Sequence, residues 1–520
     1  MKSKLSLSLQ NSEHRWISVF LIIMGVLITG FSSVQASTSL TVGFRSDFTF
    51  PVSQPTRAKP QSKLWFNDGL WWGILWSGGT SGAYHIYRLD ESSQDWIDTG
   101  TIVDDRDDSK SDALWDEGNQ KLYVASQRFV QIGETAAASI DRGKLRRYSY
   151  NTGSNTYTLD NGFPTDVNAA KSETLVLEKD STGRLWVTYT RDQAVYVNHS
   201  GSSDTDWDPD NRPFVIPTGD NSVDITSDDI SSITVFNNKI GVMWSNQSDE
   251  KMYFSVHPDS SSPTSGWSGG AVALSGNKLA DDHINLASLD GDPAGEVFAS
   301  TKTSETNARL MLLVCDSGCT SSNDWTAHTV FQESASVGNP TRPVVSIDTS
   351  NRELYVLATA RIAGGNRNIY SKITDIDNIQ FTSAGLGTSF IEGTNVSPNN
   401  TTLTKQNLNT STGFVAVAAT GNRYVHNQLI LSGGGSVVAP TLAKSFAANP
   451  ITSGDTTTLT LMLNNSNTVD LTAVAVNDSY PVEISNATPA NVSTTCGGTV
   501  TAADGGGDVD LTGATIPSSG

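Results

Sequence analysis

One phrase recurs seven times along most of the chain, and it constrains the fold more than any other feature. The phrase is a short apolar strand, a turn containing Gly, Asn or Asp, and an alternating strand rich in aromatic and β-branched residues; residues 63–72 form the first copy. The second strand of successive copies begins at Leu70, Leu122, Leu185, Ile240, Val297, Leu354 and Phe414. The intervals are 52, 63, 55, 57, 57 and 60 residues. A repeat with this period indicates an array of similar structural units.

A second landmark keeps step with the first. A polar loop is followed by an aromatic residue and a further strand, at Trp96, Tyr157, Trp207, Trp267, Trp325 and Phe381. Each unit therefore holds four short strands, and no segment of it shows a convincing apolar period of 3.6 residues, as a helix would. A row of separate sandwiches is a poorer interpretation, because units of about 57 residues are too short for seven strands each. Four-stranded sheets repeated around an axis form a β-propeller, so we predict an all-β chain with seven blades over residues 37–431.

The last blade is one strand short of four. After Phe414 the chain supplies only residues 414–420 and 423–431. Residues 39–44 and 47–50 alternate as a strand does. We therefore predict that this N-terminal region pairs beside residues 424–431 and closes the ring.

The polar loops resemble degenerate Asp-box hairpins, which join the third and fourth strands of a blade in sialidase-like propellers. The loops at 90–96, 259–267 and 316–325 carry the similarity. The resemblance covers residues 61–431 and implies a secreted bacterial propeller. It implies no sialidase catalysis, because the sequence offers no assured counterpart of the arginine triad or of the Tyr/Glu nucleophile pair.

The N-terminus has the pattern of an export signal. Lys2, Lys4 and Arg15 precede an uncharged apolar run at 19–31, and Val34 and Ala36 suit the −3 and −1 positions of a cleavage site. The run is shorter than the ~20 residues that span a bilayer. We predict a signal peptide over residues 1–36, a secreted or cell-surface protein, and no membrane span in the mature chain.

The charge balance narrows the class of partner. Asp and Glu number 54 against 34 Lys and Arg, for a net charge of −20. Because nucleic-acid binding requires cationic groups that release counterions from phosphates, nucleic acid is excluded as an expected partner. An extracellular glycan or other surface ligand is the partner expected instead.

The pattern changes after residue 431. Residues 432–438 read as a Gly/Ser linker, and residues 439–520 alternate at period two. This C-terminal part resembles the Ig-like repeats of bacterial surface proteins, which implies a β-sandwich. Such repeats continue with a further cysteine and further strands, so the domain is expected to be truncated at this point.

Cysteines and acidic residues suggest two local features. Cys315 and Cys319 bracket a turn, and we predict that they form a disulfide while Cys496 stays unpaired. The only cofactor considered is calcium, because carboxylates alternate in one loop as calcium ligands do. The glutamate expected at the twelfth place is Val215, and a solvated acidic turn is the alternative interpretation. The four carboxylates are Asp204, Asp206, Asp208 and Asp210.

An ionisable residue stands at the predicted start of every inner strand. If the register holds, these seven side chains surround one mouth of the central channel and form one ligand-binding site. The alternative is a rim that is merely hydrated. The seven residues are Lys63, Asp112, Glu173, Asp229, His283, Arg342 and Lys405.

The same residues supply candidate catalytic groups. Two of Asp112, Glu173 and Asp229 are suited to acid and base or nucleophile roles at a glycosidic bond, provided their separation allows it. His283 follows Asp281 and Asp282, and this Asp-Asp-His segment resembles one found in some propeller polysaccharide lyases. Three functions follow. The first is a glycan-binding propeller, which requires no precisely placed pair of catalytic groups. The alternatives are a glycoside hydrolase or polysaccharide lyase that acts at the same mouth of the channel, and a structural or adhesion element.

Overall fold

The structure is a computed structural model that describes residues 3–11, 54–57, 59–78, 82–130, 139–362, 365–392, 397–421, 423–431, 440–465 and 471–517. The chain divides into two compact units, Thr38–Leu431 and Met1–Ser37 with Ser432–Gly520. No helix among the described residues is long and apolar enough to cross a membrane.

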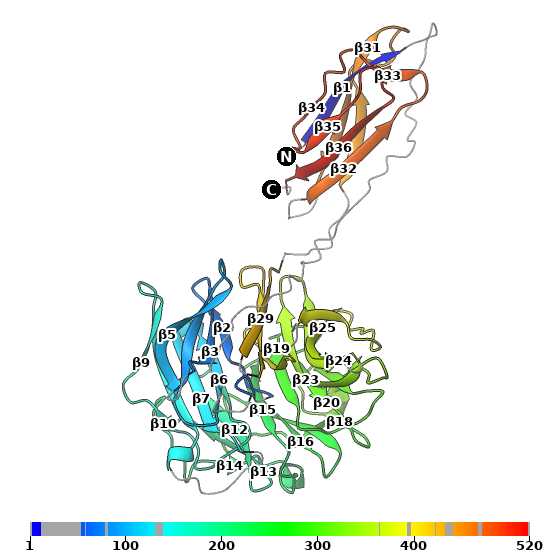
Figure 1. Cartoon of the computed structure of the whole chain (residues 1–520). Helices are drawn as coiled ribbons and strands as arrows, with labels where there is room; N and C mark the ends of the chain where they lie inside the picture. Colours follow the sequence, from blue (N-terminus) through cyan, green and yellow to red (C-terminus); the bar gives the residue numbers. More distant parts are fainter. Residues whose placement is uncertain are drawn as a thin grey trace. The chain divides into compact units, whose positions relative to one another are not determined.

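The larger unit consists of seven antiparallel sheets placed around one axis (Figure 1). The first is β2 (Leu64–Asn67), β3 (Leu70–Trp76), β4 (Tyr84–Asp90) and β5 (Asp95–Asp104). The second is β6 (Ser109–Asp116), β7 (Lys121–Arg128), β8 (Lys144–Asn151), β9 (Thr156–Leu159) and β10 (Thr165–Asp166). The third is β11 (Val176–Lys179), β12 (Leu185–Arg191), β13 (Ala194–His199) and β14 (Phe214–Val215). The fourth is β15 (Ser231–Phe236), β16 (Lys239–Asn246), β17 (Lys251–Pro258) and β18 (Ala271–Ser275).

The remaining blades follow the same pattern. The fifth is β19 (Ile284–Ser288), β20 (Val297–Lys302), β21 (Leu310–Cys315) and β22 (Trp325–Phe331). The sixth is β23 (Gly338–Asp348), β24 (Glu353–Arg361), β25 (Arg367–Asp375) and β26 (Thr388–Ile391). The seventh is β27 (Asn399–Thr402), β28 (Phe414–Thr420) and β29 (Arg423–Leu429). Four short 3-10 helices lie in connections of the described part of the unit: η1 (Glu117–Asn119), η2 (Ser139–Asp141), η3 (Gly219–Ser222) and η4 (Ser322–Asp324).

Turn chemistry explains two of the hairpins that open the repeats. Between β2 and β3, Asp68 and Gly69 have φ values of 54° and 72°, and Asn67 pairs with Leu70. Between β15 and β16, Asn237 and Asn238 have φ values of 46° and 57°. Two successive left-handed residues form the tight turn whose twist matches that of paired strands. Asn, Asp and Gly adopt this conformation at low cost, so these two turns are encoded by their own residues.

The inner strands close into a ring. Each inner strand from β2 to β23 contacts the inner strand of the next blade, in the order β2, β6, β11, β15, β19, β23 and β27. The first and last blades meet where the Leu64 backbone N–H donates to the Leu403 carbonyl at 3.3 Å and Leu64 bridges Thr404 in parallel. This topology confirms the predicted seven-bladed propeller.

Apolar residues fill the spaces between blades. Trp186 of the third blade and Trp244 and Tyr253 of the fourth share one buried cluster. Burying a large apolar side chain contributes roughly 1.5–3 kcal/mol, so these inter-blade contacts hold the ring together. The aromatic landmarks at Trp96, Tyr157 and Trp325 lie in the outer strands β5, β9 and β22 and are buried.

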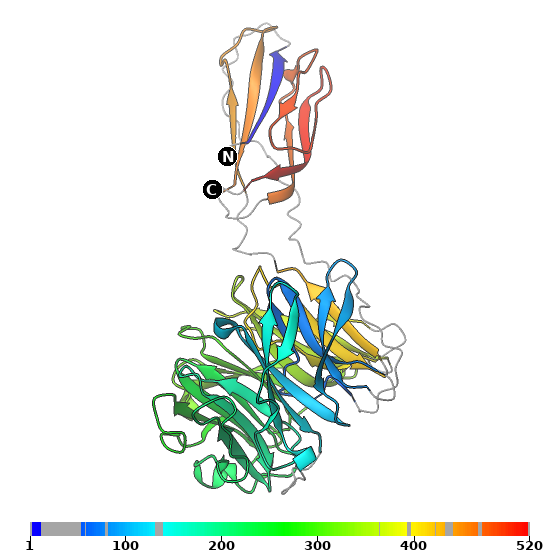
Figure 2. The ribbon, with the colours of Figure 1, turned by 90° about the vertical axis from the view of Figure 1, so that its left-hand side faces the viewer.

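The smaller unit is a two-layered β-structure (Figure 2). One sheet holds β1 (Ser3–Asn11), β30 (Thr441–Phe446), β31 (Thr456–Asn464), β33 (Ile484–Asn486) and β34 (Ser493–Thr494). The other holds β32 (Leu471–Ser479), β35 (Thr499–Thr501) and β36 (Asp508–Ile516). Leu461 of β31, Val476 of β32 and Leu511 of β36 share one core, so the two sheets face each other.

Several sequence-based predictions fall outside the described residues. They are the closing strand at 39–50, the linker at 432–438 and most of the leader at 1–36. The part of the leader that is described, β1, pairs with β31 along eight residue pairs from Ser3–Leu463 to Gln10–Thr456.

The three cysteines take two states in the structure. Cys315 and Cys319 form a disulfide at a sequence separation of 4, and Cys496 is free and buried. The bridge joins the end of β21 to the loop before η4, and both cysteines lie within the hydrophobic core cluster between the fourth and fifth blades.

Reduction of this disulfide is expected to lower the Tm of the propeller by only a few degrees. Closing so short a loop lowers the entropy of the unfolded chain by an amount worth about 2 kcal/mol. In a domain of this size, a change of about 1 kcal/mol in the free energy of unfolding shifts Tm by only a small amount. Differential scanning fluorimetry with and without reductant measures the shift, with the double variant Cys315→Ala/Cys319→Ala as the reference. A fall well beyond a few degrees contradicts this expectation.

Candidate functional site in the central channel

The residues before the first blade enter the central channel. This channel segment, residues 54–57 and 59–62, contacts several blades: Pro55 accepts a hydrogen bond from Tyr84 of the first blade at 3.3 Å. Gln61 donates to Gln127 at 3.0 Å and to the Leu175 carbonyl at 2.8 Å. Gln54 accepts from Asn400 of the last blade. A segment that reaches opposite blades must cross the axis, so the chain itself fills part of the channel.

Charged side chains of the channel segment pair with carboxylates at the amino ends of the inner strands. Lys59 Nζ lies 3.2 Å from Glu173 Oε1 and also pairs with Asp282 Oδ2. Arg57 lies 3.6 Å from the same Glu173 oxygen. The side chains of Lys59 and Glu173 are only 4% and 2% exposed, so these ion pairs are largely shielded from solvent. We call this group the amino-end cluster.

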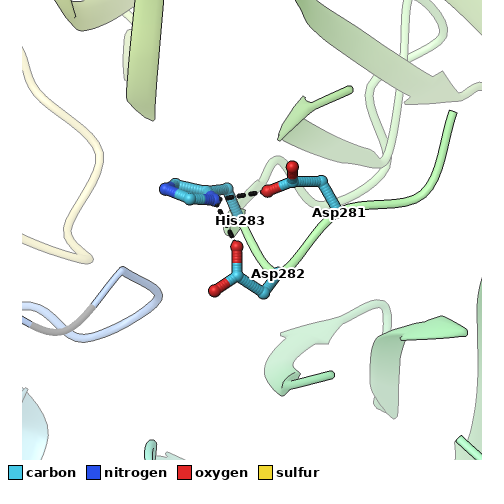
Figure 3. Close-up of side chains that lie close together, drawn as sticks. All are labelled: Asp281, Asp282 and His283. Carbon is cyan, nitrogen blue, oxygen red and sulfur yellow. Dashed lines mark hydrogen bonds and ion pairs between the residues drawn. The ribbon is translucent and has the colours of Figure 1, made fainter. Parts of the chain in front are cut away.

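His283 completes the amino-end cluster (Figure 3). Its Nδ1 faces Asp281 Oδ1 at 2.6 Å and Asp282 Oδ1 at 2.7 Å, and its Nε2 lies 3.4 Å from Thr341 Oγ1. Burial, helped by the nearby Lys59 charge, lowers the pKa of His283 to about 3. Burial alone would raise the pKa of Asp281, but His283 and Lys302 hold it well below its usual range. At neutral pH the cluster therefore contains a neutral imidazole and an ionised Asp281.

The ligand atoms of this cluster lie close enough to suit a metal ion. Asp281, Asp282 and His283 are mutually within 4.8 Å, as are Glu173, Asp228 and Asp282. However, cationic side chains already face these carboxylates: Lys59 and Arg57 pair with Glu173, and Lys302 pairs with Asp281 at 2.8 Å. The cluster is neutralised by the chain's own cations, and we assign no metal to it.

Arg342 lies near this cluster but not at the start of a strand. It sits inside β23 with φ 54°, within the second of two register shifts of the β23–β24 pairing, the one between Thr341 and Val344. Burial, together with repulsion from Arg57 and Arg367, lowers its pKa to about 10. The sequence-based register for the sixth blade is wrong, because β23 begins four residues earlier, at Gly338, and bulges before Arg342.

Three of the seven predicted residues form a second group deeper in the ring. Lys405 follows β27 instead of preceding it, and its Nζ lies 2.7 Å from Asp112 and 3.2 Å from Glu178. Asp112 lies within β6 and accepts backbone N–H bonds from Ser62 and Leu177, both at 2.8 Å. Lys63 is fully buried, donates to the Ser111 carbonyl at 3.0 Å, and has its pKa lowered to about 7 by burial.

Asp229 belongs to neither group. Its carboxylate accepts backbone N–H bonds from Thr226 at 2.7 Å and Gln247 at 3.2 Å, and burial raises its pKa. It stabilises the loop that leads into β15 and the one that follows β16. The prediction of one rim of seven residues is therefore wrong in detail, because inner strands of unequal length place the charges at different depths.

Lys59 and Arg57 are the site residues that sequence reasoning missed. They precede the first repeat, so the repeat register could not point to them. The available signal was a pair of basic residues between Pro55 and Pro60 in a chain with a net charge of −20, which marks a short extended segment with unusual charge.

A cavity of about 200 Å³ lies at the carboxyl ends of the inner strands. Pro60 and Ser62 of the channel segment line it, so the segment separates this carboxyl-end cavity from the amino-end cluster. Its apolar wall includes Leu64, Trp65, Trp115, Val235 and Leu286. Its polar groups are Ser62, Glu178, Ser232, Thr234, Ser288, Thr404, Lys405 and Gln406. Lys405 is thus the one member of the predicted seven that lines this cavity.

The acidic loop does not form a calcium cage within the described residues. Asp204 pairs with Arg147 at 2.7 Å, Asp206 with Arg212 at 3.0 Å, and Asp210 with Arg142 at 2.9 Å. Asp208 accepts hydrogen bonds from Asn211. Because each carboxylate is engaged separately, the alternative interpretation of an acidic turn describes this loop.

Comparisons with known proteins cover both units. A profile of a domain of unknown function, DUF7933, matches residues 440–520. No curated protein matches the chain in sequence.

Solved structures resemble the chain at low identity. An α-L-arabinanase from Penicillium chrysogenum complexed with arabinobiose has 12% identity and a TM-score of 0.38, over 65% of this chain and all of that one (100%). An α-L-arabinofuranosidase from Lactobacillus brevis has 11% identity and a TM-score of 0.32, over 51% and 89%. A protein of unknown function from Dyadobacter fermentans has 10% identity and a TM-score of 0.36, over 69% and 96%. At these values the propeller assignment rests on the strand pairing described above.

We expect the propeller to lose stability as pH falls from about 6.5. The folded-state pKa of His283 is about 3, below the ordinary value near 6.5. Between these two pH values, His283 is protonated in the unfolded chain and neutral in the folded chain. Stability is then fully present above pH 6.5 and falls by about 1.4 kcal/mol per pH unit toward the folded-state pKa.

Replacement of His283 by glutamine removes this titration and is expected to make the dependence of Tm on pH less steep between 7 and about 4.5. The contribution of His426, whose pKa burial lowers to about 4, remains. The matched control is His328→Gln on the outer strand β22, where burial lowers the histidine pKa less. Equal slopes for the wild type and His283→Gln would contradict the assignment of a neutral buried His283.

Proposed function

We propose that the propeller binds a carbohydrate or a chemically similar polyhydroxyl ligand in the carboxyl-end cavity. The observation that carries the proposal is the lining, which combines hydroxyl, amide and charged groups with apolar and indole surface around a common axis. Ligand pockets combine apolar walls with a few convergent polar groups in this way. The volume of about 200 Å³ lies below the ~300–1,000 Å³ of drug-sized pockets, which favours one sugar unit or a chain end.

Lys405 and Glu178 give the cavity its charged groups. Burial opposes the charge of Lys405, but Asp112 and Glu178 raise its pKa, so the ammonium stays protonated. Burial raises the pKa of Glu178. The Lys405 ammonium faces Asp112, Glu178 and the Leu177 carbonyl and so contributes a fixed positive charge, while Glu178 adds an acceptor for ligand hydroxyls.

Binding is favoured over hydrolysis at this cavity. Hydrolysis of a glycosidic bond uses two carboxyl groups on either side of the bond. Glu178 lines the cavity, whereas Asp112 is fully buried and both of its oxygens accept backbone N–H bonds. Release of reducing sugar by the purified protein would favour the hydrolase alternative, and elimination products would favour a lyase.

We further propose export and surface display, with residues 440–520 serving as an Ig-like stalk. The apolar leader supports export, and the Cys315–Cys319 disulfide suits an oxidising compartment. Cleavage before Ser37 removes β1 from the sheet that contains β31. N-terminal sequencing of the exported protein is expected to begin at Ser37, and a first residue at Met1 would contradict the leader assignment.

Ligand capture is expected to depend on the cavity hydroxyls. Thr234→Val keeps the side-chain volume but removes a hydroxyl of the lining, and it should weaken binding by ~0.5–1.5 kcal/mol. Ser288→Phe fills the cavity and should abolish binding. A glycan array on the full chain, followed by calorimetry with the best ligand, measures both effects.

The control for these variants is Thr326→Val on β22, an exposed position on an outer strand, which should bind as the wild type does. A ligand that binds the Ser288→Phe protein with unchanged affinity would place binding elsewhere. Absence of glycan binding by the folded wild type would favour the structural or adhesion alternative.

A further inference from the structure

We propose that Lys59 and Asp282 condense to an intramolecular isopeptide bond that ties the channel segment to the opposite side of the ring. The geometry that carries this inference is a buried triad in which one ammonium contacts two carboxyl groups from different blades. Lys59 Nζ pairs with Asp282 Oδ2 and lies 3.2 Å from Glu173 Oε1. The three side chains are 4%, 11% and 2% exposed, respectively.

The site presents the reactants of an amide condensation in a dry environment. Transfer of a proton from Lys59 to Asp282 converts the ion pair to a neutral amine and a carboxylic acid. The amine lone pair attacks Asp282 Cγ, and the hydroxyl group of that carboxyl leaves as water. One amide N–H remains on Nζ, so the balance is an amine plus a carboxylic acid giving an amide plus one water. No oxidant, reductant or further reactant is needed.

Glu173 is placed to move the proton. As a carboxylic acid, Glu173 donates a proton to the departing hydroxyl. The resulting carboxylate accepts the proton that the attacking nitrogen loses, which restores the initial protonation state of Glu173. Burial raises the pKa of Glu173, although Lys59 and Arg57 oppose the shift, and burial lowers the pKa of Lys59. Both shifts favour the neutral forms that the reaction uses, since a desolvated lysine is the nucleophilic one.

Burial also favours the product. A buried ion pair carries a large desolvation cost, and condensation replaces two buried charges with one neutral amide. The water released can leave toward solvent, while the burial of the triad limits the return of water for hydrolysis. The bond would join the segment before the first blade to the loop before β19, and so brace the ring from inside.

A second lysine in the channel provides the internal comparison. Lys405 contacts Asp112 and Glu178 in the same Lys-Asp-Glu combination. There, the two Asp112 oxygens each accept a backbone N–H bond at 2.8 Å, and its neighbours raise the pKa of Lys405. Those hydrogen bonds fix both Asp112 oxygens to the backbone, and the Lys405 ammonium also donates to the Leu177 carbonyl, so neither group can rearrange for attack. We therefore assign the bond to Lys59 and not to Lys405.

Mass spectrometry of the full chain tests the proposal. After disulfide reduction and denaturation, trypsin digestion should yield a branched species joining residues 58–63 to residues 279–302, one water (about 18 Da) lighter than the sum of the two peptides. Fragmentation should place the branch between Lys59 and Asp282. A succinimide at Asp290–Gly291 also loses one water, but it leaves residues 279–302 unbranched and would not support the bond.

Variants separate the chemistry from the fold. Lys59→Arg keeps the charge and removes the nucleophile, and Glu173→Gln keeps both reacting residues and removes the proton carrier; each should abolish the branched species. Glu178→Gln, the equivalent change at the Lys405 triad, should leave it intact. Recovery of both wild-type peptides unbranched and at full mass from folded protein overturns the proposal, as does a branched species that persists in Glu173→Gln.

Discussion

The meeting of the first and last inner strands is the contact on which the whole ring depends. Leu64 pairs with the segment after β27, the Lys63 N–H donates to Thr402 Oγ1 at 3.0 Å, and Tyr424 accepts a hydrogen bond from the Trp76 N–H at 2.8 Å. Each blade is a small sheet that could not bury its faces alone. Closure gives every blade two neighbours, and it also brings the residues just before β2 to the axis.

Closure therefore explains the unusual content of the channel. The channel segment must run inward to reach the first inner strand, and it carries Arg57 and Lys59 into a space lined with carboxylates. Buried charges are costly unless they are paired, and here Glu173, Asp281 and Asp282 supply the partners. The segment also divides the channel, which leaves a charged and filled amino end and a polar, ligand-sized cavity at the carboxyl end.

Much of the fold and part of the site could be predicted from the sequence. The hairpin turns are local, since Asp68-Gly69 and Asn237-Asn238 specify their own left-handed conformation, and the buried aromatic landmarks recur with the blades. The Asp281-Asp282-His283 contact is also local. In contrast, Arg342 and Lys405 were misplaced because a bulge in β23 and the short β27 shift the register, and such irregularities depend on packing between strands.

The sequence by itself determined the number of blades, the two tight turns and the short disulfide, because each of these follows from a repeat or from residues close together in the chain. The strong negative charge follows from composition alone. Only the tertiary structure decided which charges meet. Lys59 reaches Glu173 and Asp282, and Lys405 reaches Asp112 and Glu178, through contacts between residues far apart in sequence. Their depth in the channel is set by ring closure and strand length, and no local pattern encodes either quantity.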